Sequence, residues 1–169
     1  MTYSIKNTVR VLLLNDNDQL LLMRVEDFDI ATLEGKKNKR FWCTIGGKIE
    51  AGESLEEAAV REIYEETGIE KDEVELGPLV WLSEFDMILQ GNVRHFYEQF
   101  VVARTKQHNV SLDNLTPDER EAVKELRWFL LDDLRASTAI IFPVFLLNYL
   151  PDIIAGKYPA EPLKFFEKS

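Results

Sequence analysis

The chain has 169 residues, of which 46% are apolar, and a formal net charge of −10. That length suits one folded domain with its own core, so we expect a single domain over residues 1–169. The acidic balance argues against a nucleic-acid partner, because such surfaces concentrate Lys and Arg.

The lone Cys43 excludes an internal disulfide and suits a reducing compartment. It follows Phe41 and Trp42 in an apolar segment, so we expect a buried, inert thiol. No apolar run reaches membrane-spanning length, so we expect no membrane contact. Residues 1–10 lack the apolar core of a signal peptide, and we therefore expect a cytoplasmic protein.

The first elements are two apolar runs within residues 9–25, separated by the turn-forming residues 15–18. This pattern predicts a β-hairpin. Residues 26–40 are polar, with a basic patch at 36–40, and predict a long loop, which is often functional. Residues 41–45 predict a short strand that runs into Gly46 and Gly47.

A helix is predicted to begin near Ser54, because Ser54 and Glu57 have the spacing of a capping box. We expect it to end at Gly68, a common C-cap residue. At about 100° per residue, an arc of this helix faces the core. The predicted arc contains Ala59, Val60, Ile63 and Thr67.

The second half predicts strands at residues 74–83 and 93–104, with a turn at Gly91-Asn92. In the second of these strands Phe96, Glu98 and Phe100 alternate onto one face. A short helix should start at Thr116-Pro117, followed by a strand over 126–131. An apolar C-terminal helix should open at Phe142-Pro143 and run to Ala155, with Gly156 as C-cap and a kink or interruption at Pro151.

Three carboxylates on the first predicted helix point to a metal ion. Glu62, Glu65 and Glu66 have spacings of i, i+3 and i+4, so they share one face. Like charges at these spacings repel each other and destabilise a bare helix. Hard oxygen ligands suit Mg²⁺, with Mn²⁺ as a possible substitute, so this face predicts a cation site.

The stretch from residue 47 to 69 resembles the Nudix box, the signature of the Nudix hydrolases. The family pattern is G-x5-E-x7-R-E-U-x-E-E-x-G-U, where U is a bulky aliphatic residue. Every fixed position is filled, by Gly47, Glu53, Arg61, Glu62, Ile63, Glu65, Glu66, Gly68 and Ile69. The resemblance covers about a seventh of the chain, and the remainder carries no equally sharp signature.

The resemblance implies an α/β fold, an α/β/α sandwich with a curved mixed β-sheet between helices. It also implies a Mg²⁺-dependent pyrophosphohydrolase that cleaves a nucleoside diphosphate linked to another moiety by metal-assisted attack of water. Glu62, Glu65 and Glu66 would be metal ligands, with Glu65 and Glu66 also counted as catalytic. A backbone carbonyl of Gly46 or Gly47 would add another ligand.

The same resemblance assigns roles to Arg61 and Glu53. Arg61 would pair with Glu53 and hold the loop and helix in shape. In some members of the family the position of Glu53 instead orients or deprotonates water. Because others take the general base from outside the box, Glu98, Glu121 and Glu125 remain rivals, with a solvated surface charge as the plainer interpretation of the last two.

Candidate substrate contacts lie outside the box. Arg24, Lys39 and Arg40 could bind phosphate, although an exposed basic side chain is the plainer interpretation of each. Trp42, Trp81, Phe85 or Trp128 could stack on a base. For these aromatic residues we favour core packing, and only Trp42 is retained as a substrate-binding candidate.

The substrate stays open among nucleotide classes. GGKIEAGE resembles enzymes that clear oxidised nucleoside triphosphates such as 8-oxo-dGTP, yet an apolar residue such as Leu146 replaces the expected purine-reading asparagine. The patterns of coenzyme A, ADP-ribose and dinucleoside polyphosphate hydrolases are absent, and a nucleoside diphosphate sugar is a rival. The alternative functions are a catalytically idle nucleotide-binding or regulatory module and an interaction protein. The state expected in solution is a monomer or a homodimer.

Overall fold

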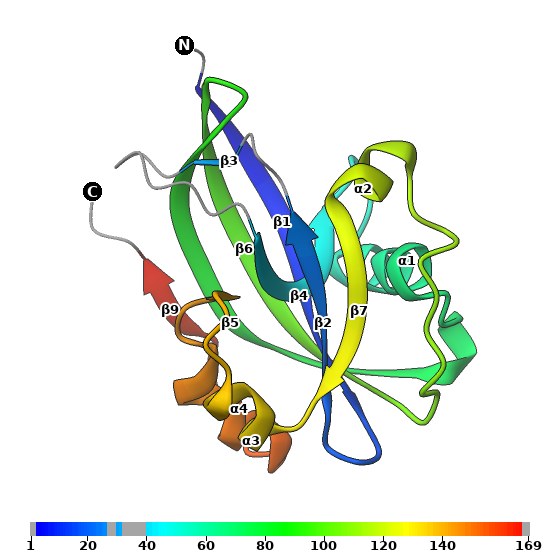
Figure 1. The fold of residues 1–169 in the computed structure, drawn as a ribbon. Coiled ribbons are helices and arrows are strands. Elements are labelled where there is room, and N and C mark those ends of the chain that lie inside the picture. Colours follow the sequence, from blue (N-terminus) through cyan, green and yellow to red (C-terminus); the bar gives the residue numbers. More distant parts are fainter. Residues whose placement is uncertain (1–2, 27–29, 32–39, 167–169) are drawn as a thin grey trace.

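A curved mixed β-sheet is the centre of the fold in this computed structural model, which describes residues 3–26, 30–31 and 40–166 (Figure 1). The strands form a path β3-β5-β6-β1-β2-β4-β8, with β7 paired to β2 and β9 paired to β5. Their bounds are β1 Tyr3–Asn15, β2 Leu20–Glu26, β3 Ile30–Ala31, β4 Arg40–Lys48, β5 Val74–Leu89, β6 Asn92–Thr105, β7 Val123–Phe129, β8 Ile141–Phe142 and β9 Leu163–Phe166.

Helices cover the two faces of this sheet. Their bounds are α1 Leu55–Thr67, α2 Pro117–Ala122, α3 Leu131–Ala136 and α4 Leu146–Ile154, and a 3₁₀ helix covers Lys71–Glu73. Buried residues of α1 belong to one core cluster, while buried residues of α3 and α4 belong to a second. The two clusters use alternate residues of the same strands, as Val11 and Leu12 of β1 show. The predicted fold class is therefore confirmed.

The hairpin predicted within residues 9–25 is only partly correct. β1 and β2 are antiparallel and meet at Leu14 and Leu20, but β4 separates them farther along because it pairs with both strands. β1 pairs mainly with β6, in parallel, from Tyr3–Val93 to Asn15–Thr105. The turn itself is as expected, and Asn15 N donates to Gln19 O at 3.0 Å.

The ends of α1 follow the local sequence. Glu57 N donates to Ser54 Oγ at 3.1 Å, and Ser54 N donates to Glu57 Oε1 at 3.4 Å, so the capping box is confirmed. Gly68 has φ 78°, the left-handed conformation that favours glycine at a helix end. On the core arc, Ala59, Ile63 and Thr67 are buried.

Several boundaries in the second half differ from the sequence prediction. The hairpin strands extend to Leu89 and Asn92, with Gln90 and Gly91 both at positive φ, the geometry of a tight two-residue turn. The strand predicted at 126–131 spans 123–129, and residue 131 already begins α3, which periodicity over six residues could not reveal.

The C-terminal segment contains four further differences. α4 starts at Leu146 rather than at Phe142, it continues through Pro151 to Ile154, and Ala155 rather than Gly156 is its C-cap. β9 was not predicted, because its pairing with β5 is set by tertiary contacts alone. Leu146, Leu150 and Ile153 of α4 are buried, so the apolar face of this helix packs into the core.

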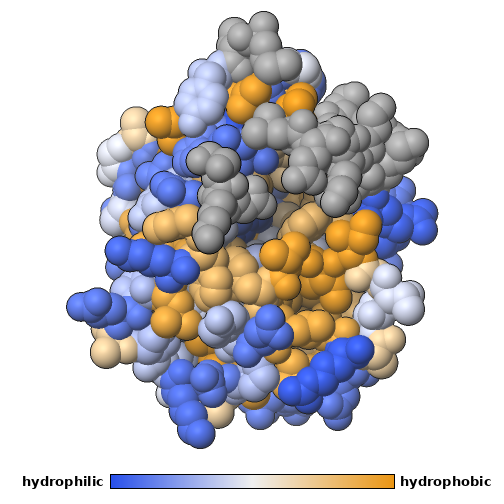
Figure 2. Space-filling model, turned by 90° about the vertical axis from the view of Figure 1, so that its left-hand side faces the viewer, coloured by the Kyte–Doolittle hydropathy of each residue, from blue (hydrophilic) through white to orange (hydrophobic). Residues whose placement is uncertain are grey.

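Apolar side chains also reach the surface. Figure 2 shows an extended apolar area on the side of the molecule where β5 and β9 lie in Figure 1. Exposed large apolar residues of the C-terminal segment include Val144, Leu163 and Phe166. Among the described residues, every helix is too short or too polar to cross a lipid bilayer.

Candidate active site

The end of β4 needs glycine at two close approaches, at Gly46 and Gly47. Gly46 has φ 144°, and a Cβ there would lie 2.1 Å from Val9 O. A Cβ on Gly47 would lie 2.5 Å from Glu62 Oε1. The two glycines therefore let the end of β4 pack directly against β1 on one side and a carboxylate of α1 on the other.

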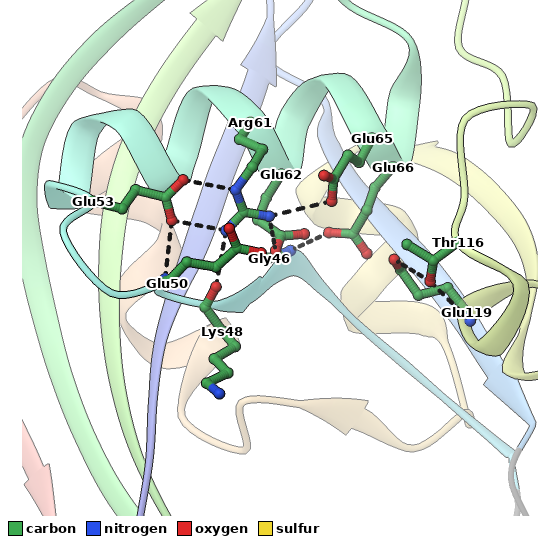
Figure 3. Close-up of polar contacts among 10 residues, drawn as sticks. All are labelled: Gly46, Lys48, Glu50, Glu53, Arg61, Glu62, Glu65, Glu66, Thr116 and Glu119. Atoms are coloured by element: carbon green, nitrogen blue, oxygen red, sulfur yellow. Dashed lines mark hydrogen bonds and ion pairs between the residues drawn. The ribbon is translucent and has the colours of Figure 1, made fainter.

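Arg61 connects the end of β4 and the loop after it to the helix α1 (Figure 3). Its Nε donates to Glu53 Oε2 at 2.7 Å and its NH2 donates to Glu53 Oε1 at 2.8 Å, while NH2 also donates to Lys48 O at 2.9 Å. Glu50 N donates to Glu53 Oε1 at 3.1 Å. The fork-shaped guanidinium thus holds both the loop and the strand end.

These contacts favour a holding role for Glu53. The hydrogen bonds from Arg61 lower the pKa of Glu53 from its ordinary value to about 2. A carboxylate with so low a pKa binds a proton weakly at neutral pH, so it is a poor general base. Of the two roles considered for Glu53, this geometry supports pairing with Arg61.

Three carboxylates converge beside the two glycines of β4. One oxygen each from Glu62, Glu66 and Glu119 lie within 4.8 Å of one another. Glu62 and Glu66 are buried on α1, and Glu119 is part-buried on α2. Glu66 Oε1 also accepts a hydrogen bond from Gly46 N at 2.6 Å, as Figure 3 shows.

Electrostatics at this cluster favour a cation. The pKa of Glu66 is raised well above its ordinary value, first because burial desolvates the carboxylate and then because the charge of Glu62 lies beside it. Burial also raises the pKa of Glu62, against the opposing effect of Arg61. Two buried carboxylates that resist ionisation together with a third nearby form an all-oxygen donor set that fits Mg²⁺ or Mn²⁺.

Glu65 takes a different position from the other two box carboxylates. Its Oε2 accepts from Arg61 NH1 at 3.2 Å, and its side chain is 28% exposed. Within the described part of the chain it is not one of the three converging groups. Its assignment as a metal ligand and catalytic residue stays a prediction.

Glu119 is the member that sequence reasoning missed. It occupies the third position of α2, where Thr116 Oγ1 donates to its Oε1 at 2.8 Å. Its only sequence signal is a helix-capping pattern, and nothing in the sequence places α2 beside α1. Glu121, named as a rival base, is exposed, and it is not in the cluster.

The other two candidate bases are bound to arginines. Glu98 is buried on β6, and its Oε2 accepts from Arg10 Nε at 2.8 Å. Glu125 on β7 lies 2.7 Å from Arg127 NH2 and 3.4 Å from Arg24 Nε. Among the described residues, neither belongs to the cluster of converging carboxylates.

The described candidate substrate-binding residues, Arg24, Arg40 and Trp42, lie on the paired strands β2 and β4, and none of them belongs to the carboxylate cluster. Arg24 pairs with Glu26 and Glu125, and Arg40, which is 71% exposed, lies 2.9 Å from Glu26. Trp42 is buried against Phe129, with the guanidinium of Arg127 5.0 Å from its ring, so little of the ring is accessible for stacking on a base. Lys39 and most of the loop predicted over 26–40 lie outside the described residues.

Two remaining features do not coincide with the cluster. Cys43 is buried, and burial raises the pKa of its thiol to about 12, as expected for an inert thiol. A cavity of about 590 Å³ is lined by residues such as Asp72, Glu75 and Arg104, and none of its lining residues belongs to the box. We therefore place the site by the converging carboxylates and not by cavity size.

Comparison with known proteins identifies the family of the chain. The family model for the NUDIX domain matches residues 5–146. An mRNA-cap hydrolase of Xenopus laevis, "m7GpppN-mRNA hydrolase NUDT17", is 38% identical over 84 residues, which cover 47% of this chain and 28% of the relative. The chain spans less than a third of the length of the curated relatives that it matches.

Solved structures share the fold. A MutT protein from Methanosarcina mazei Go1 aligns with a TM-score of 0.58 at 20% identity, covering 92% of this chain and 97% of that one. A UDP-X diphosphatase aligns with a TM-score of 0.58 at 17% identity, covering 96% of this chain and 66% of that one. At these identities the similarity establishes the architecture alone.

Proposed function

Because this chain belongs to the Nudix family, we propose that it is a divalent-metal-dependent pyrophosphohydrolase acting on a nucleoside diphosphate linked to another moiety. The observation that carries the proposal is the convergence of Glu62, Glu66 and Glu119 within 4.8 Å beside the end of β4. A pyrophosphate is an anion, and this protein has a net charge of −10. The substrate therefore needs a cation at the site where it binds.

Glu62, Glu66 and Glu119 would hold Mg²⁺ or Mn²⁺, which neutralises phosphate oxygens and makes bound water more nucleophilic. Gly46 N–H orients the carboxylate of Glu66 by occupying its Oε1. Arg61 orients Glu62, which accepts from its NH1 at 2.9 Å, while Glu53 holds the other side of the guanidinium. The residues of the box thus preorganise the carboxylates before any ligand binds.

An active enzyme is favoured over a catalytically idle module. An idle binding module would not need two desolvated carboxylates on one helix, an arrangement that is costly without a cation. Here Glu62 and Glu66 are both buried, and each is held by a specific donor. The substrate class proposed is a nucleoside triphosphate, including an oxidised one, or a nucleoside diphosphate sugar.

The test is product release from a substrate panel in the presence of Mg²⁺ and, separately, Mn²⁺. The panel contains canonical and oxidised nucleoside triphosphates, nucleoside diphosphate sugars, ADP-ribose, dinucleoside polyphosphates and a capped RNA fragment. The wild-type protein is compared with Glu66→Gln and with Glu56→Gln, a control on the exposed side of the same helix.

The expected result is metal-dependent turnover of one class, lost in Glu66→Gln and retained in Glu56→Gln. Turnover that survives Glu66→Gln would contradict the assigned site. Binding of a nucleotide without any turnover, with either metal, would instead favour the idle module.

A further inference from the structure

An ion pair between a part-buried arginine and a buried glutamate, outside the Nudix box, joins two strands that are distant in the sequence. Arg10 on β1 donates from Nε to Glu98 Oε2 on β6 at 2.8 Å, across 88 residues. The exposed fractions of the two side chains are 19% and 8%. A buried pair of this kind is seldom retained for stability, because an apolar pair of the same shape is often equally stable.

The same guanidinium reaches a third strand. Arg10 NH1 donates to Thr44 O on β4 at 3.1 Å. In this region β4 changes partner, since Thr44 is opposite Leu22 of β2 whereas Ile45 is opposite Val11 of β1. Arg10 therefore connects β6 to β4 at the place where β4 moves from one neighbour to the other.

The next residues of β4 belong to the proposed active site. Gly46 is directly opposite Arg10 in the pairing of β1 with β4. Its N–H donates to Glu66 Oε1 at 2.6 Å, so the orientation of the backbone around residues 44–46 sets the position of that carboxylate. A chain of contacts thus leads from Glu98 through Arg10 and β4 to Glu66.

We propose that Arg10 is a positioning residue for the metal-binding carboxylate Glu66, and that Glu98 acts through Arg10 rather than as the general base. The fork of Arg10 fixes the backbone of β4 by binding Thr44 O and Glu98 at the same time. This inference depends on the proposed function in one respect: that function requires the bound cation to be a divalent metal. Partners behind metal ligands typically change metal affinity 10–100-fold when they are removed.

The experiment measures Mn²⁺ affinity of the full chain by electron paramagnetic resonance of free Mn²⁺, without substrate. Arg10→Met should weaken Mn²⁺ binding by about tenfold or more. The matched control is Arg104→Met on β6, because Arg104, like Arg10, is a part-buried strand arginine that donates to backbone carbonyls, here those of Ile153 and Ile154. That control should keep the wild-type Mn²⁺ affinity.

If Arg10→Met does not fold, Arg10→Lys replaces it in the same measurement, since a lysine keeps the charge but lacks the planar fork. It should also weaken Mn²⁺ binding. Wild-type Mn²⁺ affinity in a folded Arg10 variant would overturn the proposal. No Mn²⁺ binding by the wild-type protein would overturn both this inference and the metal site.

Glu98→Gln separates the two roles of Glu98, because an amide oxygen can still accept from Arg10. We expect this variant to keep most of its kcat and most of its Mn²⁺ affinity. A loss of kcat of about 100-fold or more at unchanged Mn²⁺ affinity, with one limb of the pH profile removed, would identify Glu98 as a base and overturn the proposal. A protein that binds Mn²⁺ but turns over no substrate would contradict the proposed function alone.

Discussion

Arg61 and Glu53 form a two-bond, side-on ion pair, with Nε–Oε2 and NH2–Oε1 distances of 2.7 and 2.8 Å. The pair closes the loop that precedes α1, because the same guanidinium also binds Lys48 O at the end of β4. Its geometry requires a planar fork and not just a positive charge. Much of the site's preorganisation therefore depends on one side chain.

Arg61→Lys should disturb this loop while preserving net charge. We expect a loss of about 2 kcal/mol in the free energy of unfolding, because charge-assisted hydrogen bonds are lost and an ammonium cannot replace them in this geometry. Turnover should fall more than stability alone explains, since Glu62 and Glu65 also lose their donor. Denaturant unfolding and kcat/KM measure the two effects. Arg135→Lys on α3 is the control, and an equal effect there would contradict the prediction.

Acid stability should depend on Glu53. Its pKa in the folded protein is about 2, below its ordinary value of 4.5, because of its hydrogen bonds with Arg61. The folded state therefore prefers the charged form, and the stabilisation is complete above about pH 4.5 and is lost as the pH falls toward 2. Thermal unfolding of wild type and Glu53→Gln should differ at pH 7 and converge in acid. Parallel curves across this range would refute the idea.

The buried carboxylates of the cluster should produce the opposite dependence in the absence of metal. The folded-state pKa values of Glu66 and Glu62 are raised, so the folded protein favours their protonated forms. Their contribution to the free energy of unfolding is most favourable at pH values below the ordinary carboxylate pKa. As the pH rises above that value, the same two groups destabilise the folded protein. In EDTA at pH 8, Glu66→Gln should therefore have a higher Tm than wild type, and Mg²⁺ should raise the Tm of wild type only. A Mg²⁺-insensitive wild type would contradict this assignment.

The two adjacent glycines should respond differently to alanine. Gly46→Ala places a Cβ 2.1 Å from a backbone oxygen of β1, so we expect a loss of folding stability of several kcal/mol. Gly47→Ala places a Cβ 2.5 Å from the end of the flexible Glu62 side chain, which can move. It should cost less stability but reduce metal affinity. Thermal unfolding and Mn²⁺ titration of both variants check this. A larger loss of stability in Gly47→Ala than in Gly46→Ala, with unchanged Mn²⁺ affinity in Gly47→Ala, would be evidence against the site.

Glu119 should contribute to metal binding although it lies outside the box. Glu119→Gln removes a charge from the cluster, and Glu121→Gln removes an exposed charge from the same short helix. We expect Mn²⁺ affinity to fall about tenfold or more in the first and to stay unchanged in the second, in line with the loss of one ligand or its support. Calorimetric titration with Mn²⁺ decides the matter. Equal affinities would remove Glu119 from the site.

Local sequence was sufficient where chemistry and structure depend on neighbouring residues. The capping box at Ser54 and Glu57, the end of α1 at Gly68, and the pair of Arg61 with Glu53 all join residues at most eight positions apart. The common face of Glu62 and Glu66 follows in the same way from helical periodicity. The capping box, the helix end and the shared face could be predicted because the helix itself sets their geometry, whereas the pairing of Arg61 with Glu53, which lies before the helix, is what the resemblance to the Nudix box implies.

Tertiary structure decided the features that join distant segments. Glu119 reaches the cluster because α2 lies beside α1, and Glu98 meets Arg10 because β1 and β6 are parallel neighbours, a pairing that no local pattern encodes. The short elements α3 and β9 also escaped prediction, since their stability comes from packing and pairing with distant strands. Sequence alone thus determined the family, the fold class and the carboxylate-bearing helix. The sequence has 30 acidic residues, and only the folded chain determined which of them lie beside the carboxylates of α1. Contacts between distant segments depend on strand order and register, and separation along the sequence does not predict them.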